Sequence, residues 1–135
     1  MLARVLAFFI IALSLSGCSE PLYTNIDNTK LQSLIKNGVP LYDIRRPDEW
    51  KKTGVIEGSR LLTFIDKKGD IPPSFLPTLS SKIGKNDPVI LICRSGNRSS
   101  ILANYLMEKL AYTTVYNVED GITPWIREKK PLQKP

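Results

Sequence analysis

The sequence contains no histidine among its 135 residues. This absence excludes the histidine-activated serine and cysteine nucleophiles found in many hydrolases, and it removes the most common ligand of catalytic zinc. Cysteine is also scarce, because the chain has only Cys18 and Cys93. Two cysteines are too few for a disulfide-stapled scaffold or a four-thiolate metal centre. We therefore expect neither a metal nor a cofactor, and any catalysis must proceed without imidazole.

Internal repeats and low-complexity stretches are also absent, and an apolar content of 42% with 24% charged residues is ordinary for one globular domain. Lysine and arginine together number 19 against 13 acidic residues, which gives a formal net charge of +6. These cations are spread along the chain rather than gathered in one run. We interpret them as a solvated surface and expect no nucleic-acid partner.

The amino terminus has the order of a secretory signal: Arg4, the apolar run from Val5 to Leu13, and then small residues. The apolar run is too short to cross a bilayer. The segment Leu15-Ser16-Gly17-Cys18 resembles the lipobox of bacterial lipoproteins, in which the cysteine is acylated and begins the mature chain. A plain signal peptide with a coincidental cysteine is the alternative.

This resemblance divides the chain into a lipoprotein signal peptide (1–17), a lipidated tether (18–25) and one domain (26–131). It implies a protein of the bacterial cell envelope that is attached to the membrane through lipid on Cys18. Ser19, rather than aspartate, after the lipidated cysteine implies the outer membrane, on the periplasmic side. Cys93 is then the only thiol of the mature chain.

Short β-branched or apolar runs bounded by proline, glycine or aspartate predict strands at 41–44, 89–92 and 113–118, with weaker candidates at 59–64 and 23–26. Amphipathic patterns predict helices at 29–37 and 98–110, and shorter ones at 73–83 and 123–130. In the second helix we expect one buried face made of Ile101, Leu102, Tyr105, Leu106 and Leu110. The alternation predicts a single α/β domain with a mainly parallel central sheet flanked by helices.

The strand at 89–92 is apolar throughout, as expected for a central parallel strand, and it delivers Cys93 at its carboxyl end. A tight loop of Arg94, Ser95, Gly96 and Asn97 then leads to Arg98 and the next helix. Loop N–H groups, the helix amino terminus and two arginines would favour a nucleophilic thiolate on Cys93. The alternative is that Cys93 only fills space at the end of a core strand.

The segment Cys93-Arg94-Ser95-Gly96-Asn97-Arg98-Ser99 resembles the active-site loop of rhodanese domains. Three further segments resemble the family in the same order: Leu41-Tyr42-Asp43-Ile44-Arg45, Gly54-Val55-Ile56-Glu57-Gly58-Ser59, and the stretch from Val115 through Gly121 and Trp125 to Pro131. The resemblance implies a single-domain rhodanese-like sulfurtransferase. In such an enzyme the cysteine takes sulfane sulfur from a donor, becomes a persulfide and passes the sulfur to a nucleophilic acceptor.

In this interpretation Cys93 is catalytic, and Arg94, Ser95, Gly96, Asn97 and Arg98 bind the substrate. Arg94 beside the nucleophile favours a small anionic donor, foremost thiosulfate, and the acceptor is cyanide, a thiol or an unidentified protein. Asp43 and Arg45 support the site or form only a buried structural pair. The chain departs from the family at Val55, where histidine is usual, and at Glu57 and Asp120.

Three other functions are weighed against this one. Phosphatases of related fold place five residues between cysteine and arginine, whereas Cys93 and Arg98 enclose four. A thiol-disulfide oxidoreductase would need a second cysteine close by. A non-catalytic or sulfur-carrier binding module at the membrane surface remains the alternative, although the chain keeps its cysteine.

Overall fold

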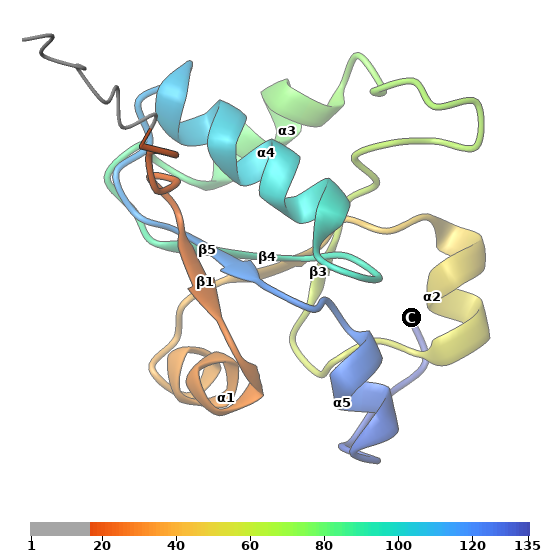
Figure 1. Ribbon diagram of the computed structural model, residues 1–135. Coiled ribbons are helices and arrows are strands. Elements are labelled where there is room, and N and C mark those ends of the chain that lie inside the picture. Colours follow the sequence, from red (N-terminus) through yellow and green to blue (C-terminus); the bar gives the residue numbers. More distant parts are fainter. Residues whose placement is uncertain (1–16) are drawn as a thin grey trace, which may run out of the picture.

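The computed structural model describes residues 17–135, in which strands and helices alternate along the chain (Figure 1). Within this range five parallel strands form one sheet in the order β1-β5-β4-β2-β3. The strands are β1 (Thr24–Ile26), β2 (Leu41–Asp43), β3 (Arg60–Leu61), β4 (Val89–Ile92) and β5 (Val115–Val118). The helices are α1 (Asn28–Lys36), α2 (Pro47–Thr53), α3 (Phe75–Lys82), α4 (Asn97–Glu108) and α5 (Thr123–Arg127). The predicted α/β class and single domain are confirmed.

Strand β4 lies at the centre of the sheet and is fully buried on both faces. Val89 and Leu91 point into one hydrophobic core, and Ile90 and Ile92 point into the other. A strand covered on both sides has no position for a polar side chain, which explains its uninterrupted apolar sequence.

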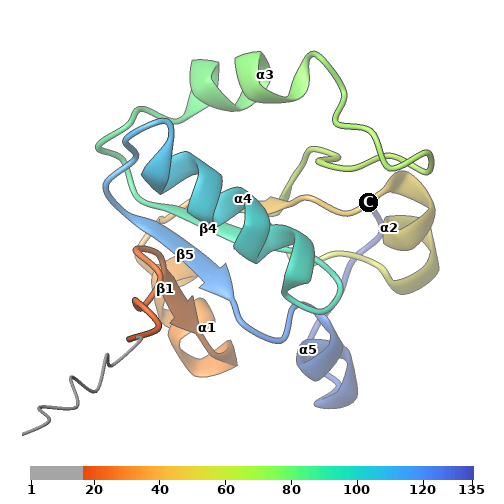
Figure 2. The ribbon, with the colours of Figure 1, turned by 45° about the horizontal axis from the view of Figure 1, so that its top comes forward.

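Helices cover both faces of the sheet (Figures 1 and 2). Helices α3 and α4 supply side chains such as Leu79 and Leu102 to one core, while α1 and α5 supply Leu31 and Trp125 to the other. Helix α2 lies on the side of the molecule toward which the carboxyl ends of the strands point (Figure 1). The sheet is thus enclosed above and below, and its carboxyl edge is left for the loops.

The folded domain is longer at both ends than the sequence division indicates. Thr24 and Asn25, assigned to the tether, pair in β1 with Tyr116 and Asn117 of β5. At the other end, Gln133 and Val55 form a two-way backbone pair, with both N···O distances 2.9 Å. Residues 24–25 and 133 are therefore part of the folded domain in the structure.

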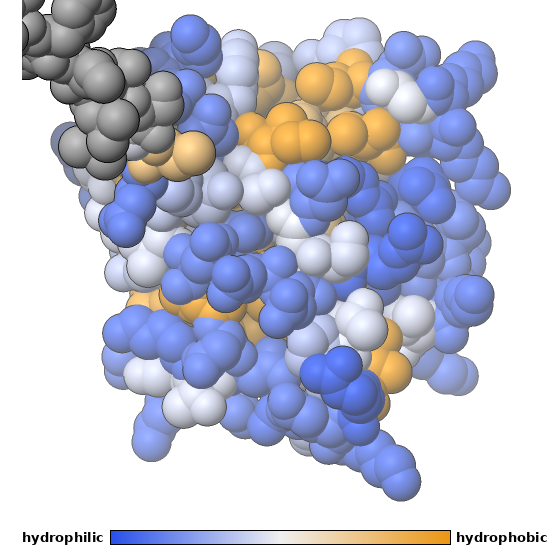
Figure 3. Space-filling view, viewed as in Figure 1, coloured by the Kyte–Doolittle hydropathy of each residue, from blue (hydrophilic) through white to orange (hydrophobic). Residues whose placement is uncertain are grey.

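The predicted buried face of α4 is only partly correct. Leu102 and Leu106 are buried, but Ile101 is 53% exposed and Tyr105 is 41% exposed. The face that packs on the sheet includes Ser99 and Ala103 instead, because small side chains let the helix backbone approach the sheet closely. Ile101 and Tyr105 belong to an apolar surface patch between α3 and α4, visible in orange in Figure 3.

Other predicted elements are shorter in the structure. Strand β3 has only two residues of the predicted 59–64, and α5 ends at Arg127 rather than continuing to 130. Lys129 has a φ of 54°, a left-handed conformation that a helix cannot continue through. Helix α2, at Pro47–Thr53, has no counterpart among the predicted helices. The other strands and helices lie within or beside their predicted ranges.

Within residues 17–135, the structure holds no helix with the length and apolarity that a membrane span requires. The predicted signal peptide falls almost entirely on residues 1–16, outside the described residues. Cys18 is described, and its side chain is exposed.

Candidate active site

The candidate site lies where β4 passes into α4. Cys93 directly follows β4 and is only 1% exposed, and α4 begins four residues later at Asn97. Gly96 caps the helix with a φ of +91°, and a Cβ at this position would collide with the backbone oxygen of Glu119. Only glycine fits this tight loop, as the sequence predicts.

The sulfur of Cys93 has two polar contacts. The N–H of Gly96 donates a hydrogen bond to Sγ at 3.1 Å, and Oγ of Ser99 lies 3.3 Å from the same sulfur. The Ser99 hydroxyl is also 3.2 Å from the backbone oxygen of Gly96. Rotation of this hydroxyl toward the sulfur would provide a second donor to a charged Sγ. A backbone donor and a hydroxyl therefore face the atom that the sequence selects as nucleophile.

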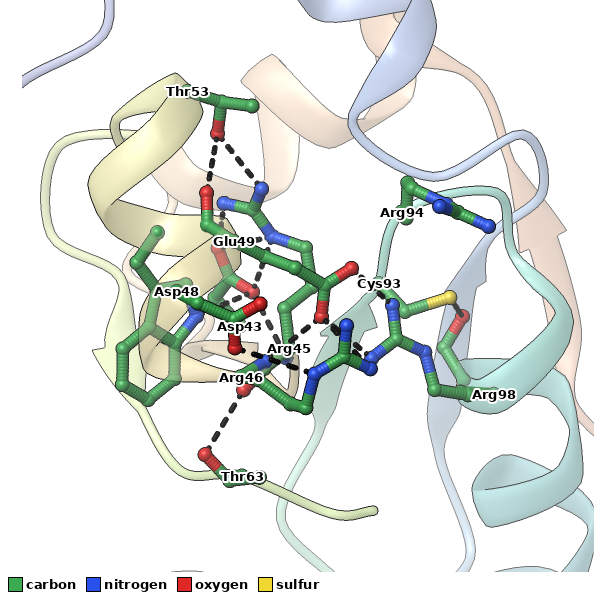
Figure 4. Close-up of polar contacts among 12 residues, drawn as sticks. Asp43, Arg45, Arg46, Asp48, Glu49, Thr53, Thr63, Cys93, Arg94 and Arg98 are labelled. Atoms are coloured by element: carbon green, nitrogen blue, oxygen red, sulfur yellow. Dashed lines mark hydrogen bonds and ion pairs between the residues drawn. The ribbon is translucent and has the colours of Figure 1, made fainter. Parts of the chain in front are cut away.

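Arg98 does not project freely toward the sulfur. Its guanidinium forms a two-pronged ion pair with Glu49, with nitrogen–oxygen distances of 2.8 and 2.7 Å (Figure 4). The hydrogen bond to Glu49 raises the pKa of Arg98, burial lowers it, and the negative charges of Glu49, Cys93 and Asp43 raise it further. Arg98 thus contributes positive charge near Cys93 while its donors are held by a carboxylate.

Glu49 is the site residue that the sequence analysis missed. It stands in the first turn of α2, and its Oε2 accepts a hydrogen bond from the backbone N–H of Arg46 at 3.0 Å. Burial raises the pKa of Glu49, but the hydrogen bonds from Arg98 and Arg46 and the charges of both arginines outweigh it. The pKa falls from 4.5 to about 2, so the carboxylate is ionised across the physiological range.

The local sequence explains why Glu49 occupies this position. Pro47 follows Arg46 at the first turn of α2, and glutamate at the third helical position reaches back to the N-cap N–H as in a capping box. This signal predicts the helix start but gives no indication that the same carboxylate also contacts Arg98, on a different element.

Asp43 and Arg45 form a buried pair at the end of β2, and both side chains are 1% exposed. The guanidinium contacts the carboxylate at 2.7 and 2.9 Å and also donates to Thr53 and to the backbone oxygen of Gly54. Nε1 of Trp50 donates to Asp43 at 3.1 Å. These bonds connect the strand end to the C-terminal half of α2 and to Gly54, so the pair positions the helix that carries Glu49.

Arg94 lies on the other side of Cys93 from Glu49 (Figure 4). It is exposed, and within residues 17–135 its guanidinium has no ion pair. It lines a cleft of about 310 Å³ between α2 and α5, together with Lys52 and Thr123. Cys93 does not itself line this cleft, but its neighbour Arg94 does. The carboxylates in the lining, Asp48 and Glu49, are paired with arginines, so the cations that remain suit an anionic substrate.

The remaining predicted site residues are less closely engaged. Ser95 and Asn97 are exposed on the loop, and the structure gives neither side chain a contact with Sγ. Val55 is 2% exposed and pairs through its backbone with Gln133. It stands where the family that the sequence resembles usually has histidine. Cys18 is a free exposed cysteine and is not part of this site.

The chain is similar to known proteins over most of its length. The protein-family model that describes the rhodanese-like domain matches residues 27–128 of the sequence. A protein named sulfurtransferase from Allochromatium vinosum is 34% identical over 97 residues, covering 72% of this chain and 80% of that protein. Thiosulfate sulfurtransferase GlpE from Tolumonas auensis is 29% identical over 104 residues, covering 76% of this chain and 88% of that protein.

Among solved structures, the chain is similar to a rhodanese-related protein from Thermoplasma volcanium. The TM-score is 0.61 at 29% sequence identity, and the match covers 84% of this chain and all of the other. The fold is thus similar to that of the other protein over the whole length of that protein.

Proposed function

This chain belongs to the rhodanese-like family, and on that premise we propose that it is a sulfurtransferase that carries sulfane sulfur on Cys93 as a persulfide. The observation that carries the proposal is the seating of Sγ, with the Gly96 N–H at 3.1 Å and the Ser99 hydroxyl at 3.3 Å. Both groups are placed to donate to a negatively charged sulfur. The sulfurtransferase names of two relatives support the same reaction class.

The reaction has two displacement steps. The Cys93 thiolate attacks the outer sulfur of thiosulfate, the sulfur–sulfur bond of thiosulfate breaks, and sulfite leaves with the bonding electron pair. An acceptor such as cyanide or a thiolate then attacks the outer sulfur of the persulfide, and the Cys93 thiolate leaves. Atoms and electrons balance without an external oxidant or a cofactor.

The chain's own residues assist at three points. The Gly96 N–H and the Ser99 hydroxyl stabilise charge on the sulfur of Cys93, both before attack and when the thiolate leaves. The Glu49–Arg98 pair fixes a cation near the same sulfur without presenting free donors to it. Arg94, exposed in the cleft, attracts the anionic donor.

The test is intact-mass measurement of the full chain after thiosulfate treatment. The wild-type protein should gain the mass of one sulfur atom, and cyanide should remove it. Cys93→Ser should gain none, at an unchanged unfolding temperature, because serine keeps the size but supplies no thiolate. A Cys93→Ser protein that gains the same mass, or a wild-type protein that gains none with thiosulfate, mercaptopyruvate or polysulfide, would contradict the proposal.

The donor preference has its own variant. Arg94→Ala should raise the KM for thiosulfate more than it lowers kcat, because the charge attracts the donor before as well as during reaction. Arg127→Ala, which removes an exposed arginine at the end of α5, is the matched control and should leave both values unchanged. Equal effects of the two substitutions would remove Arg94 from the donor site.

The burial of Cys93 favours a second candidate, a sulfur-carrier or non-catalytic binding module. A sulfur on a residue that is 1% exposed is reached only if the loop or a partner moves aside. A carrier would load one sulfur and release it only to a specific protein, whereas the proposed enzyme turns over repeatedly with cyanide. Steady-state thiocyanate production distinguishes the two. Aryl phosphate hydrolysis that requires Cys93 and exceeds sulfur transfer would favour a phosphatase instead.

We further propose that the protein is anchored in the bacterial envelope through lipid on Cys18. The support is the segment from Leu15 to Cys18 and the exposure of Cys18 at the beginning of the described chain. Growth with a labelled fatty acid should label the wild-type protein but not Cys18→Ala. Equal labelling, or none in the wild type, would contradict the anchor.

A further inference from the structure

A second depression lies beside the active-site cleft. It has a volume of about 500 Å³ and lies between α2 and the segment that follows β3. Lys51 of α2 forms one wall, Lys67 and Lys68 form the other, and Thr63 lies between them. All three lysines are exposed. We refer to this depression as the lysine groove.

The acidic residues in the lysine groove are already engaged. The carboxylate of Asp66 accepts hydrogen bonds from the backbone N–H groups of Lys68 and Asp70, at 2.8 and 3.0 Å. Asp48 is paired with Arg46 at 3.3 Å. Within residues 17–135, none of the three lysines has an ion pair. The three lysines therefore outnumber the one carboxylate, that of Asp66, which no cation pairs with among the described residues, and the groove keeps an excess of positive charge. The Asp66 turn fixes the backbone that carries Lys67 and Lys68.

The lysine groove adjoins the cleft of the candidate site. Arg46 and Asp48 line both depressions, and the second leads to Arg94 beside Cys93. Both depressions lie on the α2 side of the molecule, whereas the N-terminal segment that precedes β1, drawn in red, lies on the opposite side in both ribbon views (Figures 1 and 2). A membrane reached through Cys18 would leave this side facing away from the lipid.

We propose that the lysine groove binds an acidic segment of a partner protein whose cysteine exchanges sulfane sulfur with Cys93. The lysines come from two elements on either side of a wide, open depression, and all three are exposed, which suits an extended acidic chain better than a small anion. This inference rests on the proposed function, because the docked segment is useful only if Cys93 carries sulfur. The sequence does not indicate this role, because it does not show that Lys51 lies near Lys67 and Lys68 in the fold.

The exchange step needs no further reagent. The thiolate of the partner attacks the outer sulfur of the Cys93 persulfide, the persulfide bond breaks, and Cys93 leaves as a thiolate. The partner cysteine thereby becomes the persulfide, and the reverse step loads Cys93.

The probe is a fluorescent ten-residue peptide with one cysteine flanked by glutamates, compared with the same peptide carrying glutamines. Fluorescence anisotropy with the full chain in mild detergent measures binding, and peptide mass measures sulfur transfer from preloaded Cys93. The triple variant Lys51→Gln, Lys67→Gln, Lys68→Gln should bind the acidic peptide roughly tenfold more weakly than wild type. This difference in affinity should become smaller as salt is added, because salt screens the charges.

The matched control is Lys82→Gln, Lys85→Gln, Lys109→Gln, which removes the same charge from exposed lysines outside both depressions. It should bind within roughly twofold of wild type, since net charge alone acts weakly across screened distances. Equal losses in the two triple variants, or equal binding of the glutamate and glutamine peptides, would overturn the proposal. Thermal unfolding of both variants checks that each is folded.

A parallel sedimentation with phosphatidylglycerol vesicles tests the membrane as the occupant, using Cys18→Ala so that no lipid anchor contributes. Vesicle binding that the groove variant loses, with peptide binding intact, would overturn the proposal in favour of a lipid surface. Peptide binding that depends on the groove in a protein that never forms the persulfide would uphold the docking surface and remove the proposed sulfur transfer. The experiment thus distinguishes loss of the docking surface from loss of the proposed sulfur transfer.

Discussion

At the scale of single residues, the ion pair between Glu49 and Arg98 connects α2 to the first turn of α4, next to the loop after Cys93. The side chains are 11% and 17% exposed, so water screens the pair only partly. Because Glu49 also accepts from the Arg46 N–H, one carboxylate connects the helix start, the arginine and the neighbourhood of the nucleophile.

Glu49→Gln should lower the free energy of unfolding at pH 7 by roughly 2–3 kcal/mol, because it leaves Arg98 without a charged partner. The folded pKa of Glu49, about 2, is below its ordinary 4.5. The stability from its ionisation is therefore fully present above about pH 4.5 and is lost as pH falls toward 2. Urea unfolding of both proteins should show the difference roughly halved at pH 3.

The matched control is Glu108→Gln, which removes an exposed carboxylate at the end of α4. This variant should unfold as wild type does at every pH. A Glu49→Gln deficit that stays constant from pH 7 to pH 3 would show that the carboxylate contributes through shape alone. The charge of the ion pair would then have no part in holding α2.

At the scale of elements, α4 determines how close the nucleophile loop sits to the sheet. Ser99 and Ala103 are buried on the same helix as Leu102 and Leu106. Ser99 also contacts the sulfur of Cys93. The same small residue thus serves packing and the site. Apolarity alone predicts a different face, because Ile101 and Tyr105 are more hydrophobic than the residues that replace them at the sheet.

Leu102→Ala should therefore cost about 2–5 kcal/mol of unfolding free energy, because Leu102 is fully buried and its truncation leaves a cavity. Ile101→Ala should cost under about 1 kcal/mol, since Ile101 is 53% exposed. Chemical denaturation of the two variants measures the contrast. Similar losses of unfolding free energy at both positions would show that Ile101 belongs to the buried face of α4, as the sequence pattern indicates.

The sequence predicts those elements whose signal is local. Strand β4 matches its predicted bounds. Its short apolar run ends at a loop that contains glycine, and this local pattern indicates a central strand buried on both faces. The positive φ of Gly96 follows from the same loop. The contact of Glu49 with Arg98 could not be predicted, because it joins α2 to α4 and neither pattern contains information on the other.

At the scale of the whole molecule, the sheet gathers residues that are far apart in the chain. Lys51, Lys67 and Lys68 form one groove only because α2 and the segment after β3 are neighbours in the fold. The sequence therefore favours a uniformly solvated basic surface, and the groove becomes visible only in three dimensions. The same argument applies to Val55 and Gln133, whose pairing closes the domain with its last residues.

This closure predicts that removing residues 132–135 weakens both the fold and the site. The truncation deletes Leu132, which packs against one core, and the two backbone hydrogen bonds between Gln133 and Val55. Together these contribute about 2–3 kcal/mol. Val55 follows Gly54, whose oxygen accepts from Arg45, so loss of the pairing should also loosen the end of α2 and slow persulfide formation.

Truncation after Gln133 is the control for this prediction, because it removes Lys134 and Pro135 while keeping the Val55 pairing. Thermal unfolding and the rate of sulfur loading from thiosulfate should both distinguish the two truncations. If stability falls but the loading rate does not, α2 holds its position without the C-terminal pairing, through the Asp43–Arg45 and Glu49–Arg98 pairs. If neither changes, the C-terminal strand pairing is not part of what supports the site, and the domain ends where the sequence division places it, at residue 131.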